Sequence, residues 1–348
     1  MRRHDPPELA EPRRTRWEDA CNAAGIDGWL LTTSSLRRFV DGLWDDTIDL
    51  AGELELLEAW AGQPARGRVA VDRIDLTMLR TLREKGVEVV DAGTVLAAAR
   101  RPRAPAERTV MLEGHGLTEA AVAATLPRIE IGMTERDVSG VFAEEATRAG
   151  LEDPHIDQVW SVLPKAAGEA PWGWPDHPPY RQLTSERELE PGDLLALDAG
   201  YLHHGYMTDV GWTFVVGREP AAAEQRLARE WLAVAERVEA AVRPGATATD
   251  LRRAALVAWD RPAPPWPYPL YVAHGIGWNS IEPPLAGTDL PPEAEAAQVL
   301  EPGMLLLIEP YVWEDGVGGY RAELAVEVTD TGSRRVSELP VGELRTVG

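Results

Sequence analysis

Two strongly apolar runs in the second half of the chain each end in a carboxylate. Asp198 follows Leu194-Leu195-Ala196-Leu197, and Glu309 follows Met304-Leu305-Leu306-Leu307-Ile308. Short apolar runs of this kind predict buried strands. An unpaired carboxylate at the end of a buried strand costs several kcal/mol, so the fold must bring a metal ion or an arginine to Glu309. Arg321 is the candidate arginine.

A second aspartate, Asp209, lies eleven residues after Asp198. The two carboxylates can face one point if residues 201–205, Tyr-Leu-His-His-Gly, form a turn that brings their strands antiparallel. Taken singly, Asp198 is also a reasonable strand-end cap and Asp209 a reasonable turn residue. The later motifs favour a shared site.

Those later motifs contribute a histidine and a further glutamate. His274 begins His-Gly-Ile-Gly, and Gly275 and Gly277 remove side-chain bulk where a ligand or metal must come close. Glu323 shares a strand face with Arg321, so an ion pair is the alternative there. An oxygen-rich set with one imidazole suits Mn, Fe, Co or Zn, and carboxylates can bridge two ions. We therefore expect two divalent metal ions held by Asp198, Asp209, His274, Glu309 and Glu323.

Net charge excludes some classes of partner. The formal charge is −22 at pH 7, which would repel the phosphate backbone of nucleic acid and an anionic membrane surface. No apolar stretch reaches eighteen residues, and the N-terminus lacks the apolar core of a signal peptide. Cys21 is the single cysteine, so no internal disulfide is possible. We expect a cytoplasmic protein that binds neither nucleic acid nor membrane.

The N-terminal part alternates short apolar runs with helix-forming stretches. Residues 1–15 carry charges and prolines without periodicity, and we expect a flexible arm there. The alternation predicts a small α/β domain over residues 16–103. Its expected helices cover residues 16–24, 53–61 and 76–85, and its expected strands cover 28–33, 68–72 and 87–91.

The proline-containing segment 100–107 predicts a domain boundary, with a second domain over residues 104–348. Its expected helices cover 106–126, 134–149, 224–242 and 249–260, and its expected strands cover 194–198, 213–216, 304–309 and 325–328. Thr134 is the expected N-cap of its helix. Residues 154–191 are rich in tryptophan and proline, and a loop of that length is usually functional.

Taken in order, these motifs resemble the M24 metallopeptidase family, which contains methionine aminopeptidase, aminopeptidase P, prolidase and creatinase. The family's two metal aspartates correspond to Asp198 and Asp209, with Thr213 behind the second, its histidine to His274, and its glutamates to Glu309 and Glu323. The resemblance implies an α+β pitta-bread catalytic domain. Residues 24–31 are similar to the aminopeptidase P, prolidase and creatinase branch, which implies a small α/β N-terminal domain and a homodimer.

The resemblance also implies a reaction. A water activated between two metal ions would attack an amide or related C–N bond of a short peptide or small molecule. Glu309 would also act as general base, and His177 would lie near the leaving group. Two positions depart from the family pattern. Ile281 stands where a second histidine is expected, and Trp212 stands where an arginine is common.

These departures keep two other functions open. One is a metal-dependent lyase or creatinase-like enzyme acting on a non-peptide small molecule, with an aromatic box formed by Trp160, Trp172, Trp174, Trp212 and Trp278. The other is a binding protein that has kept the fold. The adjacent pair His203 and His204 would place at most one ring at the metals, because neighbouring strand residues face opposite sides. No serine-hydrolase elbow or phosphate-binding loop is present in the sequence.

Overall fold

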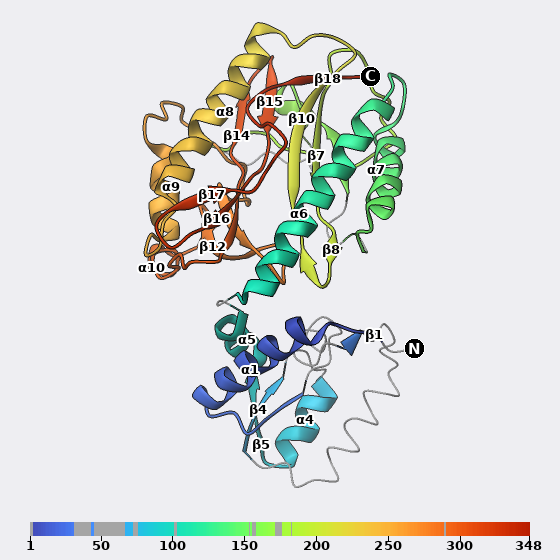
Figure 1. The fold of residues 1–348 in the computed structure, drawn as a ribbon. Helices are drawn as coiled ribbons and strands as arrows, with labels where there is room; N and C mark the ends of the chain where they lie inside the picture. The colour runs from blue at the N-terminus through green and yellow to red at the C-terminus, as the bar shows by residue number, and fades with distance from the viewer. Residues whose placement is uncertain are drawn as a thin grey trace. The chain divides into compact units, whose positions relative to one another are not determined.

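The computed structural model divides the chain into two compact units, Met1–Arg108 and Thr109–Gly348. Figure 1 shows the fold of each unit. The structure describes residues 3–30, 43–44, 67–71, 76–100, 103–152, 154, 158–170, 176–181, 183–288 and 290–348. No helix among these residues has the length and apolar character that crossing a membrane requires.

A three-stranded parallel sheet forms the centre of the first unit. Its order is β2 (Gly28–Leu30), β4 (Gly67–Val71) and β5 (Val87–Asp91). The helices are α1 (Pro7–Ala23), α4 (Leu76–Glu84) and α5 (Ala92–Arg100). Two further strands, β1 (Arg3–His4) and β3 (Leu43–Trp44), form a separate antiparallel pair. Parallel strands linked by helices agree with the predicted α/β pattern. The helix expected at 53–61 and residues 31–33 of the first strand lie outside the described residues.

The flexible arm expected over residues 1–15 is wrong from Pro7 onward, where α1 begins. The buried residues of α1 are Leu9, Arg13, Trp17 and Cys21, so its inner face repeats every four residues but includes an arginine. Arg13 is fully buried and pairs with Asp5 at 2.6 Å. A charged residue on the inner face hides the apolar periodicity by which a helix is recognised from sequence.

The second unit contains two larger sheets. The first has the order β18 (Arg345–Val347), β10 (Val210–Val216), β7 (Leu194–Ala199) and β6 (Val159–Val162). β7 is antiparallel to both of its neighbours, whereas β18 runs parallel to β10. Two helices precede this sheet in the chain, α6 (Pro105–Thr125) and α7 (Glu135–Ala149), and α7 packs against β6. Thr134 caps α7 by accepting a hydrogen bond from the backbone N–H of Asp137, as predicted.

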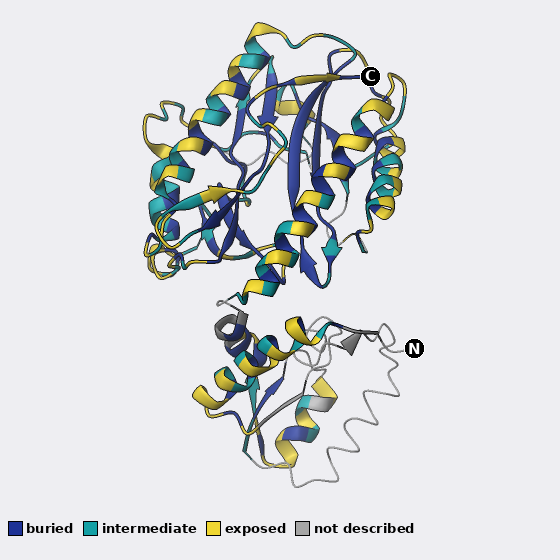
Figure 2. Cartoon of the chain, viewed as in Figure 1, coloured by how far each residue is buried: buried dark blue, intermediate teal, exposed yellow. Residues whose placement is uncertain are grey.

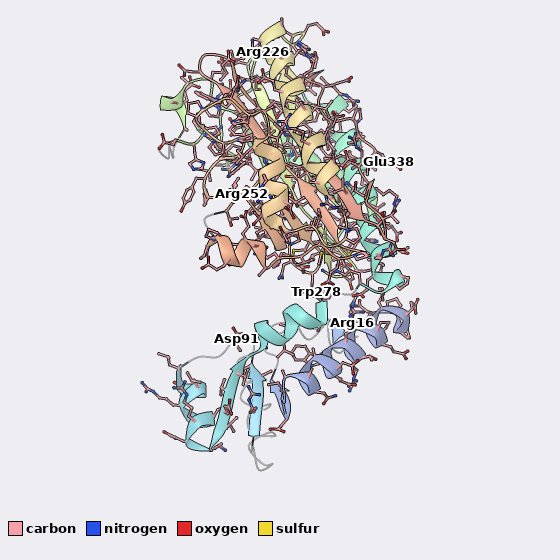
Figure 3. All side chains as sticks on the ribbon, turned by 90° about the vertical axis from the view of Figure 1, so that its left-hand side faces the viewer. Arg16, Asp91, Arg226, Arg252, Trp278 and Glu338 are labelled. Atoms are coloured by element: carbon pink, nitrogen blue, oxygen red, sulfur yellow. The ribbon has the colours of Figure 1, made fainter. Side chains whose placement is uncertain are left out.

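The second sheet of this unit is antiparallel throughout. Its order is β12 (Glu282–Ala286), β11 (Ala273–Ile276), β13 (Leu305–Ile308), β16 (Leu324–Val328) and β17 (Ser333–Arg335). Strands β14 (Tyr311–Glu314) and β15 (Gly318–Arg321) form a separate antiparallel hairpin, which packs against α8 (Ala222–Ala241). α9 (Ala248–Leu256) is joined to α10 (Pro292–Ala296) by the Arg252–Glu295 ion pair at 2.9 Å (Figure 3).

Apolar strands from both sheets share one core. The central strands β7, β10, β13 and β16 are buried along their whole length, and Figure 2 shows β7 and β10 in dark blue. α9 ends at Leu256, short of the predicted residue 260, because Val257 is extended with ψ of 126° and Ala258 after it is left-handed with φ of 56°. Because β7, β10, β13 and β16 are fully buried, they are rigid supports for any residue at their ends.

A buried carboxylate also organises part of this unit. Glu135, at the start of α7, is fully buried and accepts a hydrogen bond from the backbone N–H of Val162 in β6 at 2.8 Å. The same carboxylate pairs with Arg181 and accepts hydrogen bonds from the backbone N–H and hydroxyl of Ser185. Glu135 therefore ties the segment 181–185 to α7 and β6.

Replacing this carboxylate should destabilise the fold. We expect Glu135→Ala to lower the free energy of unfolding by about 3 kcal/mol, because Arg181 and two backbone N–H groups lose their partner. Urea denaturation monitored by tryptophan fluorescence measures this. The matched control is Glu186→Ala, since Glu186 pairs with Arg136 at 2.7 Å with side chains 69% and 67% exposed. Its expected loss is under about 0.5 kcal/mol, and equal losses would contradict the assignment.

Candidate metal centre

A hairpin brings the two aspartates together. β8 (Leu202–His203) and β9 (Tyr206–Met207) are antiparallel, and His204 and Gly205 form the turn with φ of 47° and 80°. The predicted antiparallel turn is therefore confirmed. In the pairing of β7 with β10, Asp198 lies opposite Gly211, two residues beyond Asp209.

His274 and Glu309 meet from neighbouring strands of the second sheet. His274 in β11 pairs with Leu307 in β13, and the backbone N–H of Glu309 donates to the carbonyl of Val272 at 2.9 Å. The His274 Nε2 atom lies 3.0 Å from Glu309 Oε1 and 3.6 Å from Asp209 Oδ2. Its Nδ1 lies 2.9 Å from the carbonyl oxygen of Gly275. With the proton on Nδ1, the Nε2 lone pair faces carboxylate oxygens, an arrangement that a cation between them stabilises.

Glu323 is held against β10 by the backbone. Its N–H donates to the carbonyl of Gly211 at 2.9 Å. The Thr213 hydroxyl donates to the carbonyl of Arg321 at 2.7 Å and accepts from the Arg321 N–H at 3.1 Å. A Cβ atom on residue 211 would lie 2.9 Å from Glu323 Oε1, so a side chain there would intrude on the site. Gly211 is needed for this close approach.

Arg321 lies among the carboxylates and is buried with them. Its Nη1 is 3.1 Å from Asp198 Oδ2 and its Nη2 is 2.8 Å from Glu323 Oε1. The guanidinium also forms an ion pair with Glu309. The ion pair weighed as an alternative for Glu323 is therefore present, and it extends to three carboxylates. One guanidinium still leaves this group of four carboxylates with a surplus of negative charge.

Burial and this surplus of negative charge shift the pKa values of the carboxyl groups. Burial, followed by repulsion from Glu323 and Asp198, raises the pKa of Asp209 well above its usual value. Burial is the main cause that raises the pKa of Glu323; Arg321 opposes it, and repulsion from Glu309 and Asp198 adds to it. For Glu309 burial acts upward, but Arg321 and His274 outweigh it and lower the pKa. Like charges held this close in a buried site require cations between them.

The geometry of the donor atoms suits a metal ion. Ligand oxygens of Asp198, Asp209 and Glu323 all lie within 4.8 Å of one another, and the three residues are buried. Asp209 Oδ1 and Glu323 Oε2 are buried and accept no hydrogen bond from any described residue. Buried carboxylate oxygens normally have partners. The residues present therefore fit divalent cations with oxygen and imidazole ligands.

The structure places His177 beside aromatic neighbours. It is half-buried, with Nδ1 3.4 Å from the carbonyl oxygen of Trp266 and its ring 5.5 Å from that of Tyr268. Within the described part of the chain, these contacts do not include any of the five expected metal ligands. His203 Nε2 lies 3.6 Å from Glu113, and the His203 ring lies 4.7 Å from that of His204, so these contacts also include none of the five expected ligands.

Two expectations about the surroundings of the site need correction. A Cβ atom on Gly275 would meet the backbone oxygen of Pro283 at 2.7 Å, so this glycine makes room for the neighbouring strand rather than for a ligand. The described tryptophans do not form an aromatic box. Trp160 and Trp212 belong to the apolar core, and buried Trp278 packs edge-on against Tyr206 with ring centroids 5.3 Å apart. Trp172 and Trp174 lie outside the described residues.

Two tyrosines beside the cluster escaped the sequence analysis. The Tyr271 ring lies 4.7 Å from the His274 ring, and the Arg321 guanidinium lies over the Tyr180 ring at 5.8 Å. Tyr271 precedes the His-Gly-Ile-Gly motif by three residues, which is the one sequence signal that points to it. Ile281, in the position expected for a second histidine, is 46% exposed.

Known proteins share both the sequence pattern and the fold. Residues 109–330 match the model of metallopeptidase family M24. The chain is 26% identical to the Xaa-Pro dipeptidase of Pyrococcus furiosus over 226 residues, which cover 64% of this chain and 59% of that protein. It is 31% identical to the probable dipeptidase PepE of Mycobacterium tuberculosis over 285 residues, which cover 80% of this chain and 70% of that protein.

A solved structure extends the likeness to nearly the whole chain. The dipeptidase PepE from Mycobacterium ulcerans superposes with a TM-score of 0.73 at 22% identity, covering 99% of this chain and 100% of that one. Similarity at this identity establishes the fold, and the expected α+β pitta-bread architecture is confirmed. With the family model matching residues 109–330, the chain belongs to metallopeptidase family M24, in the branch of aminopeptidase P and prolidase.

Proposed function

We propose that the protein is a metal-dependent hydrolase of the aminopeptidase P and prolidase type, acting on short peptides. The observation that carries this proposal is the buried convergence of four carboxylates and His274 around one arginine. The relatives that match are named Xaa-Pro dipeptidase and probable dipeptidase. The matched stretch spans less than two thirds of the Pyrococcus relative, so its activity is assigned to this chain only as a proposal.

The donor set divides between two ions. Asp198 and Glu323 would contact both, Asp209 would hold one, and His274 with Glu309 would hold the other. Two divalent ions, drawn from Mn, Fe, Co or Zn, acidify a water molecule and polarise a carbonyl group when bound. Glu309 would accept the proton released by the water; its neighbours His274 and Arg321 keep its carboxyl group ionised. His177 would lie toward the leaving group.

We further propose a dipeptide with proline in the second position as substrate, because matching relatives are named for that specificity. A homodimer in the cytoplasm is proposed from the resemblance to this branch, and light scattering of the purified protein tests the dimer.

One specific feature favours a second candidate function. Ile281 cannot donate a hydrogen bond, so a lyase or creatinase-like reaction on a non-peptide small molecule is the alternative.

Bound metal should depend on the buried carboxylates. After reconstitution and gel filtration, we expect about two divalent ions per chain by elemental analysis. The double variant Asp209→Ala, Glu309→Ala should retain far less metal, because each proposed ion loses a ligand. Glu186→Ala, which alters an exposed glutamate, is the control and should match the wild type. Equal metal content in all three proteins would remove the basis of the proposed function.

Hydrolysis should follow metal binding. We expect the reconstituted protein to release proline and the N-terminal amino acid from Xaa-Pro dipeptides, and the double variant to release neither. Chromatography of the amino acids released from a dipeptide library measures this. If the library yields no free amino acids while a panel of small C–N substrates is consumed, the lyase or creatinase-like candidate replaces the peptidase.

The proposed place of His177 gives a kinetic test. His177→Asn should lower kcat by about 100-fold, the usual effect of losing a proton-transfer group, with bound metal unchanged. The matched control is His204→Asn, because His204 is a half-buried histidine in the left-handed turn of the β8–β9 hairpin, where asparagine is tolerated. Loss of metal in His177→Asn, or equal kcat in both variants, would argue against a role near the leaving group.

A further inference from the structure

Tyr271 is fixed beside the proposed ligands by the backbone that follows it. The N–H of Val272 donates to the carbonyl of Ala286 at 2.8 Å, and the carbonyl of Val272 accepts from the N–H of Glu309 at 2.9 Å. The aromatic ring of Tyr271 rests against the His274 ring with 4.7 Å between centroids and 56° between planes. Two proposed metal ligands thus determine where this side chain lies.

The Tyr271 hydroxyl has no protein partner. The residue is 9% exposed, and its hydroxyl forms no hydrogen bond with any residue that the structure describes. The hydroxyl is not one of the fully buried polar atoms that lack a partner, so water or a bound molecule can reach it. Tyrosines in such positions are satisfied by an ordered water or a bound molecule. A vacant hydrogen bond beside the metal-binding cluster is therefore available to a substrate.

The chemistry of a phenol gives the direction of that hydrogen bond. A tyrosine hydroxyl ordinarily has a pKa of about 10, so it carries its proton at neutral pH and can donate. A donor is the group that an amide carbonyl requires, because negative charge develops on its oxygen during hydrolysis.

The other donors around the cluster are less available. Arg321 Nη1 and Nη2 form ion pairs with Asp198, Glu309 and Glu323, and its Nε is buried without a hydrogen-bond partner among the described residues. Ile281 offers no donor at the position where the family pattern has a histidine. The Tyr271 ring contacts a proposed ligand, His274, and its hydroxyl has no acceptor among the described residues.

We propose that Tyr271 is a catalytic residue whose hydroxyl donates a hydrogen bond to the substrate carbonyl oxygen and to the oxyanion that forms from it. The inference rests on the proposed hydrolase function and names a residue that acts in it. The tyrosine keeps its proton throughout, so it stabilises charge without taking part in proton transfer.

The test compares Tyr271→Phe with Tyr320→Phe, each of which removes one hydroxyl from a largely buried ring. Tyr320 packs against Trp231, and its hydroxyl accepts from the N–H of Gly342. We expect Tyr271→Phe to keep its metal content and its KM for an Xaa-Pro dipeptide, and to lose about 100-fold in kcat, as when one oxyanion donor is removed. Tyr320→Phe should keep the wild-type kcat.

A binding measurement separates this inference from the proposed function. A phosphinic Ala-Pro pseudodipeptide, which carries a tetrahedral anion in place of the scissile carbonyl, is titrated calorimetrically into each metal-loaded protein. Tyr271→Phe should bind it at least about 10-fold more weakly than the wild type. Unchanged affinity, or no binding to the wild type, overturns the role of Tyr271 whatever the turnover. Weakened binding without dipeptide hydrolysis by the wild type supports the tyrosine and rejects only the peptidase reaction.

Discussion

Four buried carboxylates gathered around one guanidinium are the constraint on which the rest of the second unit depends. Asp198, Asp209, Glu309 and Glu323 would repel one another, and Arg321 offsets only part of that repulsion. A chain can keep such a group together only if stronger forces fix the backbone beneath it. The fully apolar strands β7, β10, β13 and β16 provide those forces through burial.

The site depends on both sheets of the second unit. Asp198 belongs to β7, and Asp209 immediately precedes β10. His274 comes from β11, while Glu309 and Glu323 flank β13 and β16. Two groups of hydrogen bonds join β10 of the first sheet to the chain that leads into β16 of the second. The Glu323 N–H donates to the carbonyl of Gly211, and Arg321 exchanges hydrogen bonds with the Thr213 hydroxyl. Backbone links of this kind hold ligand atoms more firmly than side-chain contacts do, which favours a site that is organised before any ion arrives.

Local patterns predicted the elements whose signal lies in their own residues. Strands β7, β10, β13 and β16 were recognisable from apolar runs, and α7 from the cap at Thr134. Helix α1 was missed at its start because its inner face contains Arg13, whose partner Asp5 compensates the buried charge. The tryptophans were misleading for a related reason, since composition does not reveal whether an aromatic ring faces a cavity or the core.

The sequence by itself determined which residues must be compensated in the interior: carboxylates that follow apolar runs, a histidine among glycines, and an arginine two positions from a glutamate. Their order along the chain also indicated the family. Only the tertiary structure decided that Arg321 reaches three of the carboxylates, that Gly275 accommodates a strand, and that Tyr271 stands beside His274 with an unused hydroxyl. The physical reason is that such contacts depend on the packing of distant strands, which no local pattern encodes.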